Sequence, residues 1–188
     1  MKYKIEKNTV QETLIIPLYS RKLCSELYPD IYSDKSAVEL INQIDYDFSQ
    51  AEKNSQSLMQ RFGALEVAAR QSDLAFEVRD YLKQHPNATV VNLGCGLDST
   101  GKNCDNGSCK IYNLDFPNVI KVRNELLPPL EREENIACNL NDTEWFNKID
   151  ASNGAIFFAS GVFYYFLNEE VKALVKNMEN AFPNSVLV

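Results

Sequence analysis

One segment constrains the fold more than any other: an apolar run that stops abruptly at two glycines. The run covers residues 89–93, and Gly94 and Gly96 follow it. A second apolar run, 110–114, ends on the carboxylate of Asp115. In a doubly wound sheet, such glycines let the backbone approach a ligand, and an acid at the tip of the next strand accepts from ribose hydroxyls. The pattern predicts an adenosine-bearing cofactor, although a Gly-x-Gly pair alone also marks ordinary turns.

Strands and helices are expected to alternate from residue 89 onward. The predicted strands are 89–93, 110–114, 135–138, 155–159 and 185–188, and the predicted helices are 117–127, 143–148 and 168–181. Such alternation indicates an α/β fold with a mostly parallel sheet and helices on both faces. The short, turn-rich stretch between the first two strands leaves room for a crossover helix of one or two turns. A dinucleotide pyrophosphate needs a proper helix N-terminus there, so NAD and FAD are disfavoured.

The first 85 residues are predicted to be helical. Apolar residues recur at helical spacing in four segments, 10–28, 36–44, 57–71 and 73–84. Ser36 opens a capping-box pattern at the start of the second segment. We therefore expect a helical region, 1–85, and an α/β region, 86–188, within one domain.

Composition excludes several classes of partner. The 188 residues carry a formal net charge of −7, and phosphates would be repelled, so no nucleic-acid partner is expected. No apolar run approaches the roughly 20 residues that span a bilayer, so no membrane association is expected. The charged N-terminus does not resemble a signal peptide. Five cysteines, an odd number, suit free thiols in a reducing compartment, and we expect a cytoplasmic protein.

Three residues are candidates for metal or nucleophilic chemistry. Cys104 and Cys109 flank a polar loop. A local disulfide or half a metal site is conceivable there, but two loop thiols are the simpler interpretation, and no metal site is predicted. His85, the sole histidine, lies at a predicted helix end and is interpreted as a capping residue. A Ser-His-Asp or Cys-His enzyme would need His85, so both are disfavoured.

Further segments follow a family pattern. They are 18–22, 69–73, 85–98, 114–119 with Arg123, 136–140 with Trp145, and 160–165. With these residues the sequence resembles the leucine carboxyl methyltransferase-like group of class I S-adenosylmethionine-dependent methyltransferases, which includes polyketide O-methyltransferases. The resemblance implies a Rossmann-like sheet, S-adenosylmethionine as cofactor, and a lid formed by region 1–85.

The resemblance also implies roles for single residues around the cofactor. Backbone at Gly94 and Gly96, with Cys95 in the pocket wall, would approach the methionine part. Asp115 would accept from the ribose diol, since two acceptor oxygens match two hydroxyl donors. The adenine would be bordered by Asn139, Leu140 and Asn141.

At the methionine end of the cofactor, the resemblance implies basic and aromatic partners. Arg70 would pair with the cofactor's carboxylate, with Lys22 assisting. A solvated helix face is the alternative for Arg70. Tyr165 matches a family tyrosine and is the candidate catalytic residue, but core packing would explain it equally well.

The sequence departs from the family pattern in three places. Ser160 stands where the family usually has an acid, so one polar contact near the methionyl end is in doubt. Residues 98–101 lack the arginine that commonly follows the glycines. The family's sheet has seven strands, whereas this pattern stops in the fifth, so the last strands are missing. The chain is then either a fragment or a homo-oligomer that covers the edge of its fifth strand.

These features predict an S-adenosylmethionine-dependent O-methyltransferase. The methyl acceptor would be a carboxylate or hydroxyl of a small molecule or peptide. Methyl transfer from a sulfonium to a carboxylate needs positioning rather than acid–base catalysis, which suits a chain with one histidine. A non-catalytic cofactor-binding module or decayed relative is the alternative, and an enzyme that uses another adenosine-bearing ligand is a third.

Overall fold

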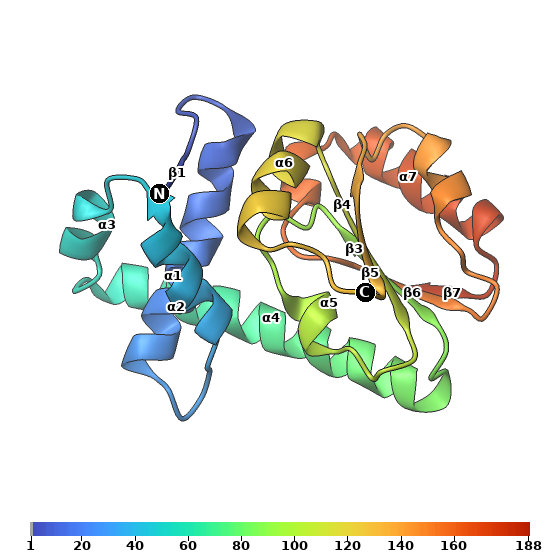
Figure 1. The fold of residues 1–188 in the computed structure, drawn as a ribbon, viewed down its shortest axis with the longest axis horizontal. Coiled ribbons are helices and arrows are strands. Elements are labelled where there is room, and N and C mark those ends of the chain that lie inside the picture. The colour runs from blue at the N-terminus through green and yellow to red at the C-terminus, as the bar shows by residue number, and fades with distance from the viewer. Residues whose placement is uncertain (1) are drawn as a thin grey trace.

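A five-stranded parallel sheet forms the centre of the molecule in a computed structural model that describes residues 2–188 (Figure 1). The strands are β3 (Thr89–Leu93), β4 (Lys110–Asp115), β5 (Glu133–Ala137), β6 (Ala155–Ala159) and β7 (Ser185–Leu187). Their spatial order is β5-β4-β3-β6-β7, and every neighbouring pair is parallel. The chain therefore changes direction across the sheet between β3 and β6, where α/β folds bind ligands. The predicted α/β fold is confirmed.

The two faces of the sheet are covered by different helices, as the apolar strands require. Alternate residues of β3 point to opposite faces, and all five are buried. Val90 packs in a cluster with Val78 and Leu82 of α4 (Leu58–Gln84). Val91 packs on the other side with residues of α7 (Asn168–Ala181), among them Leu174. Burial on both faces explains why β3 is a continuous apolar run in the sequence.

The remaining elements between the strands are short. They are α5 (Thr100–Asn103), α6 (Pro117–Leu126), the 3-10 helix η2 (Glu144–Lys148) and the 3-10 helix η3 (Phe163–Tyr165). The four-residue α5 confirms that the first crossover has only a turn of helix. The segment 143–148 was predicted as an α-helix, and it is a 3-10 turn that buries Trp145.

The N-terminal region packs beside the sheet as a helical layer. It contains η1 (Val10–Leu14), α1 (Ile15–Leu27), α2 (Lys35–Gln43), α3 (Ser49–Asn54) and the small parallel pair β1 (Tyr3–Lys4) and β2 (Ile44–Asp45). Apolar residues of α1 and α2 share a core with Val119 and Val122 of α6. The cap of α2 is Asp34, whose carboxylate accepts from the Ala37 N–H, so the prediction that Ser36 opens this helix was wrong.

Two predicted helices, 57–71 and 73–84, are one helix. The 27-residue α4 begins after Ser57, whose hydroxyl accepts from the Gln60 N–H, and continues to Gln84. No glycine or proline interrupts it near residue 72, and the Ser72 hydroxyl donates to the Ala68 carbonyl within the helix. Figure 1 shows α4 running from the N-terminal helices to the sheet, so it connects the two predicted regions.

The two thiols of the polar loop are core residues. Cys104 and Cys109 are buried in the cluster between α4 and the sheet, with Ile111 and Phe158. Their interpretation as loop thiols was therefore wrong about their environment. Within residues 2–188, no helix has the length and apolar character that crossing a membrane requires.

Candidate cofactor-binding site

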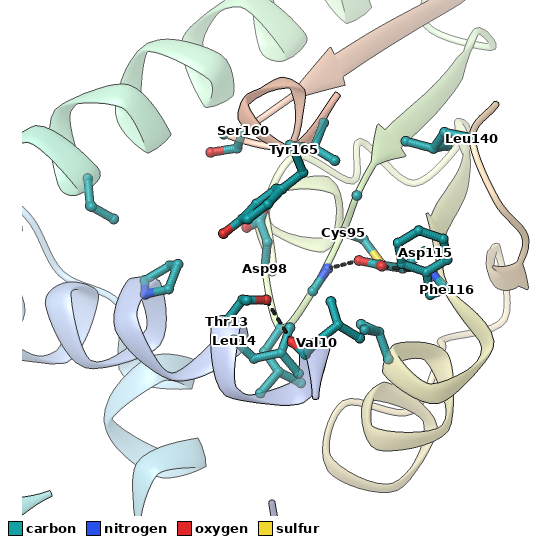
Figure 2. Close-up of a pocket in the computed structure, with 18 of the residues that line it drawn as sticks. Val10, Thr13, Leu14, Cys95, Asp98, Asp115, Phe116, Leu140, Ser160 and Tyr165 are labelled. Atoms are coloured by element: carbon teal, nitrogen blue, oxygen red, sulfur yellow. Dashed lines mark hydrogen bonds between the residues drawn. The ribbon is translucent and has the colours of Figure 1, made fainter. Parts of the chain in front are cut away.

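A cavity of about 500 Å³ opens where the carboxyl ends of β3, β4 and β6 meet the N-terminal helices (Figure 2). The sheet side of its wall is formed by Gly94, Cys95, Gly96, Leu97, Asp98, Asp115, Phe116, Val119, Cys138, Leu140, Ser160, Gly161, Val162, Tyr165 and Phe166. The helical side is formed by Asn8, Thr9, Val10, Thr13, Leu14, Pro17, Arg21, Val67, Arg70 and Gln71. The cavity thus lies at the position that the glycine pattern predicted.

The glycine loop after β3 forms one wall through its backbone. Gly94 has φ of +67°, and a Cβ added there would stand 2.4 Å from Cγ2 of Val162, so only glycine fits. Gly96 has φ of +46°, and its added Cβ would lie 3.1 Å from Leu14 of the lid. The missing side chains therefore let the chain turn sharply and bring backbone to the cavity surface.

Asp115 lies at the tip of β4, where one carboxylate oxygen faces the glycine loop and the other faces the start of α6. Its Oδ2 accepts from the Gly96 N–H and its Oδ1 from the Phe116 N–H, each at 2.8 Å. Burial raises the pKa of this carboxyl, and the two N–H groups and Arg123 act in the opposite direction. Each oxygen retains a second acceptor site, so the carboxylate can still accept from the two hydroxyls of a ribose.

Arg70 reaches the cavity from α4. Its Nε donates to the Ser160 hydroxyl at 3.1 Å, at the end of β6. Its guanidinium also lies 3.5 Å from the position of a Cβ on Gly161, so any side chain at that glycine would crowd it. The arginine fork is therefore held at the cavity wall and is not on a solvated helix face, and an arginine fork matches a carboxylate.

Of the three residues predicted to border the adenine, one lines the cavity and two do not. Leu140 lines the cavity together with Phe116 and Cys138, which offers an apolar surface for a planar ring. Asn139 and Asn141 lie outside the lining. The Asn139 side chain accepts from the Asn141 N–H, and the Asn141 side chain donates to Glu170 at 3.0 Å.

Two further predicted residues differ in placement. Lys22 lies outside the cavity lining, where its Nζ pairs with Glu26 at 2.8 Å and stands 5.5 Å from the centre of the Tyr19 ring. Tyr165 does line the cavity, in η3, and its side chain is among those drawn in Figure 2. With 72% of its surface exposed, Tyr165 is not the core residue that its aromatic neighbours suggested.

The sequence did not identify the lid residues of the wall. Val10, Thr13, Leu14 and Pro17 belong to η1 and α1 and line the cavity opposite the glycine loop. Helical spacing shows that this segment is amphipathic, but it cannot tell which residues face the sheet. Only the packing of α1 against α4 and of η1 against α6 decides that.

The parallel sheet, the glycine loop and the cavity at its switch point define a class I S-adenosylmethionine-dependent methyltransferase fold. Residues 18–179 match the model of the leucine carboxyl methyltransferase family, and the chain belongs to that family. This membership confirms the family that the sequence motifs indicated.

Individual relatives are similar at low identity. The chain is 26% identical over 180 residues to the tetracenomycin polyketide synthesis O-methyltransferase TcmP of Streptomyces glaucescens, with 95% of this chain and 64% of that protein covered. It is 24% identical over 196 residues to the S-adenosyl-L-methionine-dependent methyltransferase dpfgK of Gibberella zeae, with 98% and 65% covered. The chain thus spans slightly less than two thirds of the length of these relatives.

A solved structure resembles the chain at lower identity. Human N-acetylserotonin methyltransferase in complex with S-adenosylmethionine superposes with a TM-score of 0.47 at 13% identity, over 88% of this chain and 46% of that one.

Proposed function

We propose that this chain binds S-adenosylmethionine in the cavity and transfers its methyl group to an oxygen atom of an acceptor. The observation that carries the proposal is the separation of Asp115 and Arg70. Asp115 ends β4 and Arg70 contacts Ser160 at the end of β6, with β3 between these strands. Two strand spacings separate these ends by about 10 Å. A ligand with a diol at its centre and an amino-acid carboxylate at one end suits that spacing.

Each part of the wall has a role in the proposal. Asp115 accepts from the ribose hydroxyls, Arg70 binds the carboxylate, and Phe116 and Leu140 cover the adenine. The cofactor, when bound, supplies a methyl group activated by a positively charged sulfur. The lid residues Val10 and Leu14 close the opposite side and exclude water, so the protein's contribution is to orient two reactants.

A carboxylate is the acceptor that the chemistry of the wall favours. Asp98 accepts at Oδ1 from the N–H and hydroxyl of Thr100 at 2.7 and 2.8 Å and from the Gln71 side chain, and at Oδ2 from the Asn92 side chain, so four donors already hold this carboxylate. Burial raises the pKa of the Cys95 thiol, so it stays a neutral thiol near neutral pH and is not available as a base. His85 packs on Tyr81 at the end of α4 and does not line the cavity. A hydroxyl acceptor would need a base, whereas a carboxylate needs none.

The family and one relative support an oxygen acceptor. The family is described as leucine carboxyl methyltransferase, and TcmP as an O-methyltransferase of polyketide synthesis. We propose a carboxylate of a small molecule or peptide, with a hydroxyl as the alternative. A non-catalytic cofactor-binding module remains the second candidate, because Ser160 replaces an acid of the family pattern.

Two titrations and one assay test the proposal. Calorimetry with S-adenosylmethionine and with S-adenosylhomocysteine should show one site for each. Incubation with a methyl-labelled cofactor and a panel of aromatic and aliphatic carboxylic acids should yield labelled esters, which mild alkali hydrolyses. Absence of binding to either ligand would contradict the function itself. Binding without transfer to any acid or hydroxyl compound would favour the non-catalytic module.

A reducing compartment such as the cytoplasm is proposed for the chain. All five cysteines are free, including the buried pair Cys104 and Cys109.

A further inference from the structure

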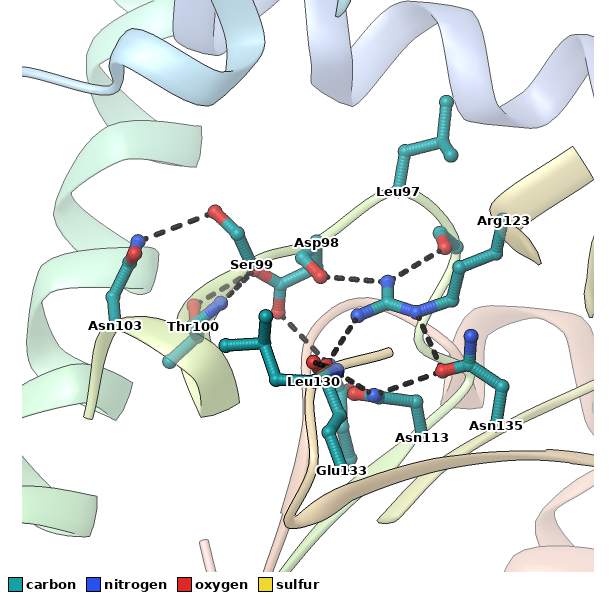
Figure 3. Close-up of polar contacts among 12 residues, drawn as sticks. Leu97, Asp98, Ser99, Thr100, Asn103, Asn113, Arg123, Leu130, Glu133 and Asn135 are labelled. Atoms are coloured by element: carbon teal, nitrogen blue, oxygen red, sulfur yellow. Dashed lines mark hydrogen bonds and ion pairs between the residues drawn. The ribbon is translucent and has the colours of Figure 1, made fainter. Parts of the chain in front are cut away.

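Three consecutive carbonyl groups of the glycine loop accept hydrogen bonds from two buried arginines. Arg123 of α6 donates from Nη1 to the carbonyls of Gly96 and Asp98, at 3.0 and 2.7 Å. Arg21 of α1 donates from Nη2 to the carbonyl between them, that of Leu97, at 2.8 Å. Figure 3 shows the Arg123 guanidinium beneath the loop. The loop is therefore held from the sheet side and from the lid side at once.

Arg123 is separated from the cavity that it supports. Its side chain has no exposed surface and does not line the cavity. The rest of its fork is engaged deeper in the protein, with Nε donating to Asn135 at 3.1 Å and Nη2 lying 3.4 Å from Glu133. A buried ion pair is often no more stabilising than packed apolar residues, so its presence here is better explained by the geometry that it imposes.

Gly96 connects Arg123 to Asp115. Its carbonyl accepts from Arg123, while its N–H donates to the Asp115 carboxylate at 2.8 Å. Gly96 has a positive φ and no side chain, so its own packing restrains it little. The two hydrogen bonds therefore determine where this residue lies, and with it the orientation of the carboxylate.

We propose that Arg123 is a positioning residue for the cofactor: it holds Gly96 and Asp98 by their carbonyls and so keeps Asp115 oriented toward the ribose. This inference rests on the proposed function, because it concerns the same site. It predicts that Arg123 affects the adenosine half of the ligand, whereas Arg70 affects only the amino-acid half.

Calorimetric titration with adenosine and with S-adenosylhomocysteine tests the split. Arg123→Lys keeps the charge beside Glu133 but loses the fork, and should weaken both ligands by about tenfold or more. Arg70→Gln should weaken S-adenosylhomocysteine and leave adenosine within about twofold. The stoichiometry of each titration checks that the variants are folded. It should stay at one ligand per chain, because an unfolded fraction would lower the stoichiometry and not the affinity.

The pH profile supplies a readout that a merely structural role would not move. Arg123 is one of the groups that lower the pKa of Asp115. In the double variant Arg123→Gln/Glu133→Gln, which removes both charges together, adenosine affinity should therefore fall at a higher pH than in the native chain. Arg123→Lys retains the charge and should keep the native profile while showing the weaker affinity.

Control measurements distinguish a failure of the positioning role from a failure of the proposed function. Arg132→Gln removes another arginine of the same region, paired with Asp105 away from the cavity, and should bind both ligands like the native chain. If native protein fails to bind S-adenosylhomocysteine, the proposed function is wrong. If native protein binds and the folded Arg123→Lys variant binds adenosine within about twofold of native, the positioning role is wrong. If Arg123→Lys does not fold, the double variant takes its place in this comparison.

Discussion

Asp115 combines two demands at the scale of a single residue. Under the proposed function its carboxylate must stay ionised to accept from a diol, yet it lies in a buried position that raises its pKa. The N–H groups of Gly96 and Phe116 offset part of that cost because they are oriented toward the negative charge. The turn after β3 supplies one of these N–H groups and the residue that follows β4 supplies the other.

Replacement of Asp115 by alanine should weaken the binding of S-adenosylhomocysteine by about 1–3 kcal/mol, since charge-assisted hydrogen bonds to the ribose are lost. Calorimetry measures the change, and circular dichroism checks that the variant is folded. An unchanged dissociation constant in a folded variant would show that the ribose binds elsewhere.

Cofactor affinity should depend on pH through the same residue. The diol needs the ionised carboxylate, so affinity is full above the pKa of Asp115 and falls as the pH drops through it. Because burial raises that pKa, the fall should begin at a higher pH than an ordinary exposed aspartate would give. Titration of adenosine affinity between neutral and acid pH measures it, and an affinity independent of pH in the folded range would contradict the assignment.

Substitutions at two glycines distinguish the cost of backbone strain from the cost of a steric clash. Gly94 and Gly107 both have positive φ, but only Gly94 has a neighbour where a Cβ would stand, Val162 at 2.4 Å. Gly107→Ala should cost about 1–2 kcal/mol of unfolding free energy from backbone strain alone. Gly94→Ala should cost clearly more and also weaken cofactor binding. Urea denaturation compares them, and equal losses would mean that the Val162 contact relaxes freely.

At the scale of elements, α4 joins the lid to the sheet. Its first half packs on α1 and its second half covers the sheet, so one continuous helix holds Val67, Arg70 and Gln71 at the cavity. The sequence pattern suggested two helices because the apolar face changes partner along the helix, from α1 to β6. Hydrophobic periodicity shows which residues of a helix are buried, but it does not show which element they pack against. The sequence therefore suggested a break in the helix where only the packing partner changes.

The thiols beneath α4 should be unreactive in the folded protein. Burial raises the pKa of Cys104 to about 11 and also raises that of Cys109, so the thiolate is scarce near neutral pH. Modification by a thiol reagent at pH 8 should be slow at these two cysteines and fast after unfolding, as peptide mapping would reveal. Rapid labelling of either in native protein would mean that α4 opens easily.

The same pair should bind no stoichiometric zinc. Within residues 2–188 no group of three or more His, Cys, Asp or Glu side chains is placed to hold a metal ion. The double serine variant should leave cofactor affinity unchanged, although it should lose about 1–3 kcal/mol of stability because hydroxyls would be buried in an apolar cluster. Zinc that copurifies with the native chain and disappears in the variant would contradict this.

At the scale of the whole molecule, one edge of the sheet is a partly exposed strand. Within the described residues, β7 is an edge strand, half-exposed, with Val186 42% exposed. Unpaired backbone groups at an edge favour pairing with another chain. The 188-residue chain is therefore expected to self-associate through β7.

Sedimentation at increasing protein concentration tests the edge. Val186→Lys should weaken self-association, because a charge at an edge strand opposes pairing. Val175→Lys on α7, with a similarly exposed valine at 39%, should leave it unchanged. A native chain that remains monomeric at high concentration would contradict the expectation.

The sequence by itself determined the strands, the glycine loop and the acid at the end of β4. These are local features: a strand buried on both faces must be a continuous apolar run, and a turn with positive φ needs glycine. Hence the bounds of β3, β4 and β6 were predicted closely.

Only the tertiary structure decided which side chains meet across the cavity. The lid residues Val10 and Leu14, the Arg70–Ser160 contact and the placement of Lys22 outside the lining depend on how separate helices pack on the sheet. The hydrogen bonds from Arg21 and Arg123 to three successive carbonyls likewise join residues far apart in the chain. Such contacts come from shape and burial across elements, and periodicity within one element carries no information about its partner.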